Sequence, residues 1–401
     1  MRRRGVPLTP ARTASDWRTR IDRFGSRAMA AVGDWIAPGP RPGPSEPRIS
    51  ALVALVALAG GVLPIMIMVV TWAAKPKPVH HDCPVAAHGR SGTVLADQPA
   101  QERYRPAGQC NSAGSENRIE RTAVGRYRVT FGKLGQDGGV AEVTPVTADD
   151  RICTLTDWRP DGDDEQVEVA CFDRSGAAAD SGFSARYRYL RDGGGTAAYL
   201  RLGDPGRTSQ TVEDAYGYNS AGGINSADRE DVGSYVVYFG RQEQAAGGTV
   251  KVSAVGEAAT VCGVERWFTY PEGNYLAVRV RCRDAAAQAV DSRFAVSFTV
   301  GADGGAYLRA DRPSEAGYTA TGDYQFNGAG RSNTVSRAAV GHYLVSLPGV
   351  LADGGNVQVT PYAGDAVCVV DPRDRNSAVR VVCRGPSGTP VDAQFLLAYW
   401  R

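Results

Sequence analysis

The feature of this sequence that most constrains its fold is a segment that occurs three times. It begins at positions 124, 232 and 340, which are 108 residues apart, and each copy starts with valine and glycine and has tyrosine in its fourth position. A period of this length is typical of repeated domains, because solenoid repeats are only about 20–50 residues long. The sequence therefore predicts three similar units in one chain.

Each unit has the residue pattern of β-strands. Apolar and polar side chains alternate with a period of two: Tyr127, Val129 and Phe131 fall on one face of a strand, and Arg126 and Arg128 on the other. Neighbouring glycines at matching positions indicate turns. One apolar face per strand predicts antiparallel sheets packed face to face, and about seven short strands in roughly 100 residues is the size of a β-sandwich.

We expect an all-β fold of three tandem antiparallel β-sandwich modules of about 105 residues each. The modules are predicted to cover residues 92–194, 195–303 and 304–401. We call these ranges repeat 1, repeat 2 and repeat 3. Each opens with a strand of its own, and the linkers are so short that we expect the modules to follow one another as a stiff rod.

The cysteines predict a set of disulfides. All eight follow an uncharged segment at 49–72, and an even number on one side of such a segment indicates an oxidising compartment. Six form one pair in each repeat, which predicts Cys153–Cys171, Cys262–Cys282 and Cys368–Cys383. These spacings are too short for the inter-sheet bridge of an immunoglobulin domain, so each bridge should join neighbouring strands. The remaining two, Cys83 and Cys110, are predicted to tie the stalk to repeat 1.

The N-terminal region has the organisation of a membrane anchor. Residues 49–72 carry no charge and are long enough, as a transmembrane helix, to cross a hydrocarbon core of about 30 Å. Residues 1–48 contain ten arginines against four acidic residues, so we expect this side to stay in the cytoplasm. Within it, 14–36 has the pattern of a short basic amphipathic helix, followed by a Pro-rich linker. Residues 73–91 would form an extracellular stalk, and a cleaved signal peptide is the alternative.

The stalk contains a candidate metal site. His80, His81 and His88 lie near Cys83, and imidazole and thiolate are ligands of zinc and copper. Their spacing matches no closed structural site, and Cys83 has a predicted disulfide partner. We therefore expect no metal and no other cofactor.

Two tryptophans are the candidate binding residues of the repeats. Trp158 and Trp267 each lie five residues after the first cysteine of their pair. An exposed indole could stack on a sugar ring, whereas a tryptophan folded over the disulfide would belong to the core. The repeats contain no recurring serine, histidine and carboxylate set and no glycine-rich loop that opens a helix, so we expect no enzyme.

Two further residue types recur at matching positions and are interpreted as structural. The asparagines precede small residues, where an amide side chain favours a turn, and the aspartates precede the last strand, where a carboxylate caps a turn. They are Asn111, Asn219 and Asn327, and Asp180, Asp291 and Asp392.

These recurring elements resemble those of uncharacterised actinobacterial membrane-anchored or secreted proteins with tandem disulfide-bonded β modules. The resemblance lies in Val340 to Tyr343, Gly354-Gly355, the Cys368/Cys383 pair and Asp392 to Phe395. It covers residues 92–401 and implies a fold and a placement, but no activity.

The formal net charge of +2 argues against nucleic-acid binding, which leaves a basic footprint. We expect a non-catalytic single-pass membrane protein that presents an interaction or spacer rod outside the cell. Its partners would be the lipid bilayer and an extracellular protein or a cell-wall glycan. Two alternatives are a glycan-binding protein that uses Trp158 and Trp267, and a receptor-like sensor that acts through a cytoplasmic partner.

Overall fold

The computed structural model describes residues 89–190, 195–212, 215–243, 247–301, 305–352, 355–373 and 378–400. The predicted amphipathic helix, the segment 49–72 and the stalk up to residue 88, with its three histidines and Cys83, lie outside these ranges. No helix in the described ranges is long and apolar enough to cross a membrane. The described residues are all-β, as predicted.

Nine strands fall in each repeat among the described residues, and repeats 2 and 3 each add a short 3₁₀ helix. Repeat 1 contains β1 (Gly89–Ala96), β2 (Arg103–Tyr104), β3 (Gln109–Asn111), β4 (Asn117–Ala123), β5 (Arg126–Phe131), β6 (Val140–Pro145), β7 (Arg151–Asp161), β8 (Asp164–Asp173) and β9 (Phe183–Leu190). Repeat 2 contains β10 (Thr196–Leu202), β11 (Ser209–Val212), β12 (Gly217–Asn219), β13 (Asn225–Asp231), β14 (Ser234–Gly240), β15 (Thr249–Val255), β16 (Thr260–Tyr270), η1 (Pro271–Gly273), β17 (Tyr275–Asp284) and β18 (Arg293–Val300). Repeat 3 contains β19 (Ala306–Ala310), β20 (Gly317–Thr319), η2 (Gly322–Tyr324), β21 (Gln325–Asn327), β22 (Thr334–Ala339), β23 (His342–Ser346), β24 (Asn356–Tyr362), β25 (Val367–Asp371), β26 (Val379–Arg384) and β27 (Gln394–Trp400).

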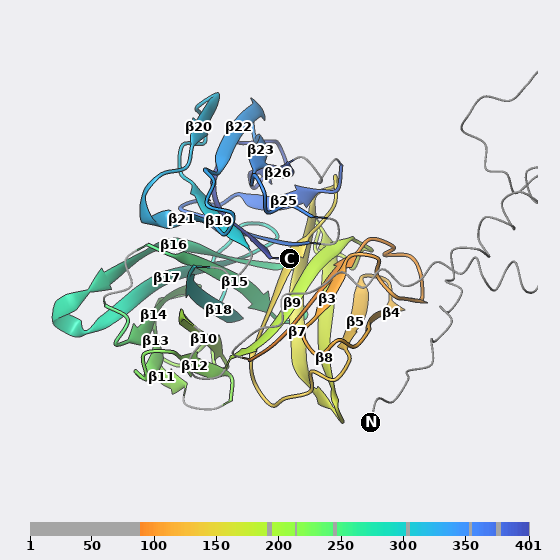
Figure 1. The fold of residues 1–401 in the computed structure, drawn as a ribbon, viewed down its shortest axis with the longest axis horizontal. Helices are drawn as coiled ribbons and strands as arrows, with labels where there is room; N and C mark the ends of the chain where they lie inside the picture. The colour runs from red at the N-terminus through yellow and green to blue at the C-terminus, as the bar shows by residue number, and fades with distance from the viewer. Residues whose placement is uncertain are drawn as a thin grey trace, which may run out of the picture. The chain divides into compact units, whose positions relative to one another are not determined.

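Each repeat builds two antiparallel groups of strands that pack like a β-sandwich (Figure 1). In repeat 1, the order β3-β1-β9-β6 forms one layer and β7-β8-β5-β4-β2 the other, and repeats 2 and 3 follow the same plan. The opening strand of each repeat pairs with the last strand of the same repeat. The alternation of β5 has its predicted effect, because Tyr127, Val129 and Phe131 are buried between the layers.

Three disulfides join neighbouring strands, as the spacing predicts. They are Cys153–Cys171, Cys262–Cys282 and Cys368–Cys383, and in each the two cysteines lie directly opposite each other in the pairing register. Cys110 is also disulfide-bonded. Its predicted partner, Cys83, lies outside the described residues.

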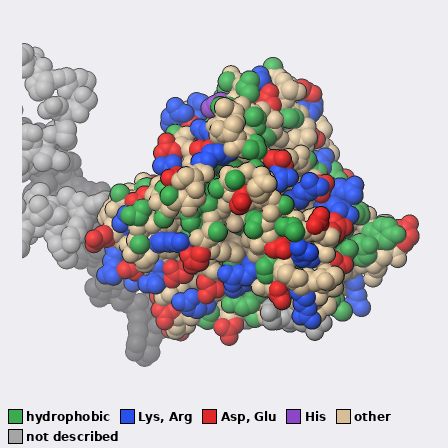
Figure 2. All heavy atoms as spheres, turned by 180° about the vertical axis from the view of Figure 1, so that it is seen from behind, with side chains coloured by type: hydrophobic (Ala, Val, Ile, Leu, Met, Phe, Trp, Pro, Cys, Tyr) green, Lys and Arg blue, Asp and Glu red, His purple; other side chains and the backbone are tan. Residues whose placement is uncertain are grey.

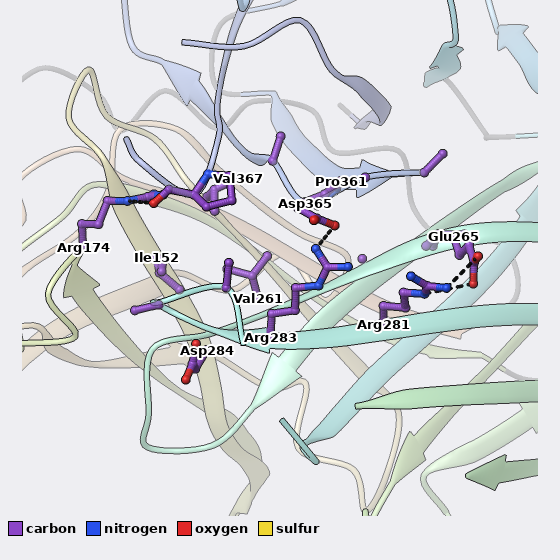
Figure 3. Close-up of a pocket in the computed structure, with 18 residues that line it drawn as sticks. Ile152, Arg174, Val261, Glu265, Arg281, Arg283, Asp284, Pro361, Asp365 and Val367 are labelled. Carbon is purple, nitrogen blue, oxygen red and sulfur yellow. Dashed lines mark hydrogen bonds and ion pairs between the residues drawn. The ribbon is translucent and has the colours of Figure 1, made fainter. Parts of the chain in front are cut away.

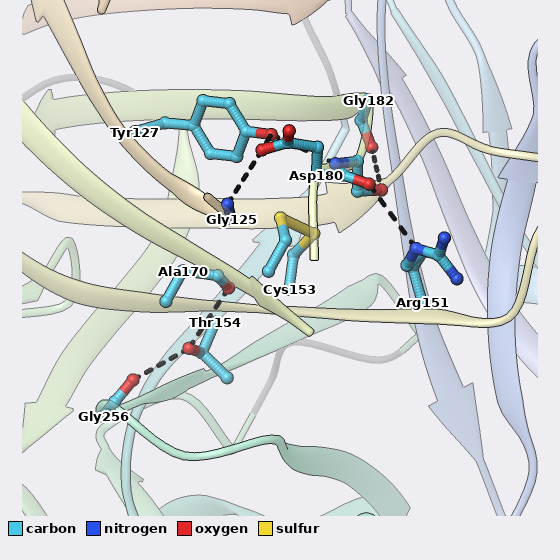
Figure 4. Close-up of a disulfide and its surroundings, with 11 residues drawn as sticks. Gly125, Tyr127, Arg151, Cys153, Thr154, Ala170, Asp180, Gly182 and Gly256 are labelled. Atoms are coloured by element: carbon cyan, nitrogen blue, oxygen red, sulfur yellow. Dashed lines mark hydrogen bonds between the residues drawn. A yellow bond between two sulfur atoms is a disulfide. The ribbon is translucent and has the colours of Figure 1, made fainter. Parts of the chain in front are cut away.

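The repeated aspartate caps the turn of the repeated segment (Figure 4). In repeat 1, Asp180 accepts hydrogen bonds from the backbone N–H of Gly125 at 2.8 Å and from the hydroxyl of Tyr127 at 3.0 Å, and Arg121 donates to both of its oxygens. Asp291 and Asp392 make the same contacts in repeats 2 and 3. Each carboxylate therefore ties a hairpin turn to the segment that leads into the last strand.

The repeated asparagine holds a second turn. Asn111 accepts a hydrogen bond from the N–H of Ala113 at 2.8 Å and donates to Asn117 at 2.7 Å. Equivalent pairs recur in the other two repeats. The structural interpretation of both residue types is therefore confirmed.

The three repeats close into a ring in which each repeat contacts both others. Single parallel bridges join Leu155 to Val255, Val264 to Tyr362, and Val370 to Val146. The third bridge brings repeat 3 back against repeat 1. The predicted rod is therefore wrong, because a linear row would keep its first and third units apart.

Equivalent backbone hydrogen bonds accompany these bridges. The N–H groups of Thr147, Gly256 and Ala363 donate to the carbonyl oxygens of Val370, Leu155 and Val264, at 2.7, 2.7 and 2.9 Å. Strands of two repeats thereby join into one sheet, as in the nine-stranded sheet that contains β15 and β7.

Hydroxyl groups line the centre of the ring, on the strands β6, β15 and β24. Oxygens of Thr144, Ser253 and Thr360 accept hydrogen bonds from the backbone N–H of Val359, Val143 and Val252, at 2.9, 3.0 and 3.3 Å. Each repeat accepts from one neighbour and donates to the other. The contacts therefore run in one direction around the ring.

Charged side chains are buried beside these hydroxyls. Glu142 and Lys251 occupy equivalent positions on β6 and β15, and both are 3% exposed. Glu142 accepts a hydrogen bond from the hydroxyl of Ser297 at 2.6 Å and pairs with Arg186 at 3.5 Å. The ammonium group of Lys251 donates to Thr249 at 2.7 Å. Burial, partly offset by the negative charge of Glu142, lowers the pKa of Lys251 to about 7.

Candidate functional site

The candidate site is a pocket of about 300 Å³ to which all three repeats contribute (Figure 3). We call it the junction pocket. Repeat 1 provides Ile152 and Arg174, repeat 2 provides the facing parts of β16 and β17, and repeat 3 provides the segment from Pro361 to Val367 and Pro386. The pocket therefore depends on ring closure.

Its apolar floor comes from one repeated position. The residue before the first cysteine of each pair faces away from its own sandwich, because the cysteine faces inward and side chains alternate along a strand. These residues are Ile152, Val261 and Val367, and they pack in one cluster with Phe172 and Ala259. The disulfide strands of the three repeats thus meet at the floor.

A smaller cavity of about 40 Å³ has a lining that overlaps the floor. Its lining includes the first cysteine of each pair, Cys153, Cys262 and Cys368, and the equivalent valines Val143, Val252 and Val359. The disulfides therefore hold the strands that form both cavities.

One ion pair connects repeats 2 and 3 across the pocket, and a second lies beside it within repeat 2. Arg283, on β17, pairs with Asp365, which lies in the segment between β24 and β25. Figure 3 shows the Arg283 side chain reaching from its strand to this carboxylate. Arg281 lies two residues earlier on β17 and forms a two-pronged pair with Glu265 of β16, at 3.0 and 3.1 Å.

Arg174 connects repeat 1 to repeat 3 at the other side of the pocket. It donates to the carbonyl oxygens of Gly385 and Pro386 and pairs with Asp150 at 2.9 Å. A side chain of repeat 1 thus holds the turn after β26 in place.

The electrostatics of the pocket favour charged and polar groups at its margin. Burial lowers the pKa of Arg283, the like charge of Arg281 lowers it further, and the charge of Glu265 opposes this. A guanidinium group stays protonated at neutral pH in spite of such a shift. The pocket therefore presents fixed positive charges, each with a carboxylate beside it, around an apolar floor.

The ionisable side chains of the lining are arginines and three carboxylates, those of Glu265, Asp284 and Asp365. The lining contains no serine, cysteine, histidine or lysine. The described residues contain no group of three or more side chains that could hold a metal ion.

The two predicted binding tryptophans lie elsewhere and are not exposed. Trp158 is 0% exposed, and the guanidinium of Arg201 from repeat 2 lies over its ring at 4.6 Å. Trp267 is 6% exposed and contacts the rings of Tyr324 and Tyr362 from repeat 3. The expectation of exposed stacking platforms is wrong, because each tryptophan fills the contact between its own repeat and the next.

Sequence reasoning missed the residues of the junction pocket. Arg283 and Asp365 are 82 positions apart and look like ordinary surface charges in a strand and a turn. One available signal was the residue before each first cysteine, which is apolar in all three repeats although it falls on the outer face. An apolar residue repeated on an outer face indicates a covered surface.

Comparison of the chain with known protein families, with curated proteins and with solved structures gives no match.

Proposed function

We propose that this chain is a non-catalytic recognition protein of the cell envelope, in which three β-sandwich modules form a compact binding head instead of a spacer. The observation that carries the proposal is the junction pocket, which forms only because all three repeats meet. A spacer has to be long, whereas a ring in which repeat 3 contacts repeat 1 is shorter than a row of the same three units.

We further propose that segment 49–72 anchors this head as a single-pass transmembrane helix. Residues 1–48, with the amphipathic helix, would lie in the cytoplasm, and residues 73–91 would lead to the head outside. The arginine excess of residues 1–48 supports this orientation. The disulfides support it too, because such bridges persist in oxidising compartments.

The partner that best fits the pocket is a segment of an extracellular protein. The floor accepts an apolar side chain, and the paired charges of Arg283 and Asp365 and of Arg281 and Glu265 can re-pair with charged groups of a peptide. No aromatic ring lines the pocket, so it lacks a surface on which a sugar could stack. A glycan partner is therefore less well supported, and a sensor role would rest on a cytoplasmic partner of residues 1–48.

Site-specific photo-cross-linking in intact cells tests this function. A photoreactive residue at Ala285, on the pocket lining, should give a discrete product of higher mass that protease added outside the cells can digest. Arg283→Glu should abolish the product, because the new carboxylate faces Asp365 and repels a bound acidic group.

The matched control is a photoreactive residue at Val124, which is 52% exposed on the turn before β5. Equal products at both positions, or none at Ala285, would contradict a specific site. A product that resists external protease would contradict the proposed orientation.

A further inference from the structure

A second surface, on repeat 2, has apolar and aromatic side chains at positions where repeat 1 has polar ones. Ile224, Phe268 and Tyr270 are 61%, 39% and 44% exposed, and Tyr238 and Tyr275 are partly exposed beside them. We call these five residues the aromatic face. They lie on four adjacent strands or their ends, in the order β13, β14, β17, β16, and hydrophobic side chains gather at the projecting end of the β16–β17 hairpin (Figure 2).

The pairing register places the five residues in two neighbouring rows. Tyr238 lies opposite Ala277, which lies opposite Phe268. In the next row, Gly240 lies opposite Tyr275, which lies opposite Tyr270, and Ile224 adjoins Gly240 at the start of β13. Tyr275 contacts both Tyr238 and Tyr270, with ring centroids 5.0 and 5.3 Å apart. The rings therefore form one continuous surface.

Repeat 1 shows that the sandwich does not need this surface in order to fold. The equivalent positions in the register of repeat 1 all carry polar side chains: Glu116, Thr130, Arg159, Asp161 and Asp164. The backbone pairing of β7 with β8 matches that of β16 with β17, including the bulge. Five apolar or aromatic side chains at positions that are polar in repeat 1 therefore indicate a contact that repeat 2 makes and repeat 1 does not.

The charges beside the aromatic face are arranged so that two copies of the chain could form ion pairs with each other. One row further along, Asp228 lies on β13 and Arg266 on β16, at opposite margins of the same face, with Val236 and Arg279 between them. A twofold rotation about an axis parallel to the strands lays β13 of one copy over β16 of another. It sets each Asp228 opposite the other copy's Arg266.

The same rotation matches the shapes of the aromatic rows. It lays β14 over β17, so that the large side chain of Tyr238 in one copy lies opposite the small side chain of Ala277 in the other. It also brings Ile224 against Tyr270. A contact in which residue i meets j and j meets i is the signature of a twofold interface between identical chains.

We infer that the aromatic face is a docking surface for a second copy of this chain, and that the protein forms a twofold dimer through the outer face of β13, β14, β17 and β16. Tyrosine, phenylalanine and arginine are the residue types that concentrate in such interfaces. A stacked sugar is the poorer fit, because Tyr275 has a neighbouring ring on two sides and Arg266 lies over Phe268 at 5.3 Å.

Sedimentation equilibrium of the full chain in detergent, over a range of protein concentrations, measures this dimer. The variant Phe268→Arg/Tyr270→Asp gives β16 the residues that β7 of repeat 1 has at the equivalent positions, Arg159 and Asp161, so it should fold. It should raise the dissociation constant of the dimer by about tenfold or more. Val340→Arg is the matched control, because it removes an apolar side chain of similar exposure, 50%, from repeat 3 and should leave the constant unchanged.

Charge exchange separates this dimer from association through any other surface. Asp228→Arg and Arg266→Asp should each weaken the dimer several-fold, and the double variant should restore it, because each new charge again meets its opposite. The inference is overturned by a chain that stays monomeric, by dimers that all these variants leave unchanged, or by a double variant that is weaker than both single ones.

Discussion

At the scale of single residues, the buried cluster at the centre of the ring makes the most specific prediction. Lys251 lies among Glu142, Arg186 and Thr249, and burial lowers its pKa to about 7. Because an unfolded lysine titrates near 10.4, the unfolded chain binds more protons than the folded chain between about pH 7 and pH 10. The contribution of Lys251 to stability should therefore rise with pH across this window, and the full penalty of its buried charge should be present below pH 7.

Lys251→Met should remove this dependence. We expect the variant to gain on the order of 2 kcal/mol in free energy of unfolding at pH 6 and to lose the rise in stability that Lys251 contributes between pH 7 and 10, because the buried ammonium is gone. Denaturant unfolding at several pH values, followed by tryptophan fluorescence, measures both effects. Lys133→Met, at an exposed lysine, is the control. A destabilised variant would mean that the ammonium is needed as a partner of Glu142.

At the scale of elements, the aspartate cap is a shared device of all three repeats. In repeat 2, Asp291 accepts from the N–H of Gly233 at 2.9 Å and from the hydroxyl of Tyr235 at 3.0 Å, and pairs with Arg229 at 2.8 Å. Hydrogen bonds from Arg229, then from Gly233 and Tyr235, lower the pKa of Asp291 against its burial. This contribution to stability is present above pH 4 and is lost as the pH falls through the lowered pKa.

Asp291→Ala should lower the free energy of unfolding by about 2–4 kcal/mol, because it leaves an N–H, a hydroxyl and a guanidinium without their acceptor. Asp291→Asn keeps a neutral acceptor for Gly233 and should cost less. Chemical denaturation at pH 7 compares the two variants. Equal losses would show that charge alone matters, and no loss would show that water replaces the carboxylate.

The elements themselves were predictable because their signals are local. A period of two in residues 126–131 sets which side chains of β5 are buried, and the cysteine spacings follow from the two strands that each pair joins. The tryptophans show where this reasoning stops. Trp158 and Trp267 follow the same alternation, but what covers them is Arg201 in one case and Tyr324 and Tyr362 in the other, all from the next repeat.

At the scale of the whole molecule, ring closure couples the repeats. Thr144 and Val359 are 215 positions apart, and no local pattern predicts that they meet. Short linkers are compatible with a row and with a ring. Outer-face residues such as Ile152 and Val261 decide between the two arrangements, because they pack together only when the ring forms. The sequence did not predict the junction pocket for the same reason, because its lining residues come together only in the ring.

We expect residues 89–400 to unfold in one calorimetric transition, because each repeat is held by both others. Ser253→Ala leaves the buried N–H of Val143 without its acceptor and should cost about 1–3 kcal/mol. Its effect should be a shift of the whole transition to lower temperature, with Val340→Arg as a surface control. Separate transitions, or a shift of one component alone, would mean that the repeats are energetically independent.

The contacts that run in one direction around the ring also determine how many repeats fit into it. A row of modules can be lengthened by duplication, since each added unit finds the same neighbour as the last. Here the accepting side of Thr144 already meets repeat 3, and the donating side of Val359 already meets repeat 1. A fourth unit would have to open this joint and change the angle of every other. A fourth unit would therefore need a different closure of the ring, whereas substitutions in loops and outer faces leave the three joints intact, as the outer face of repeat 2 shows.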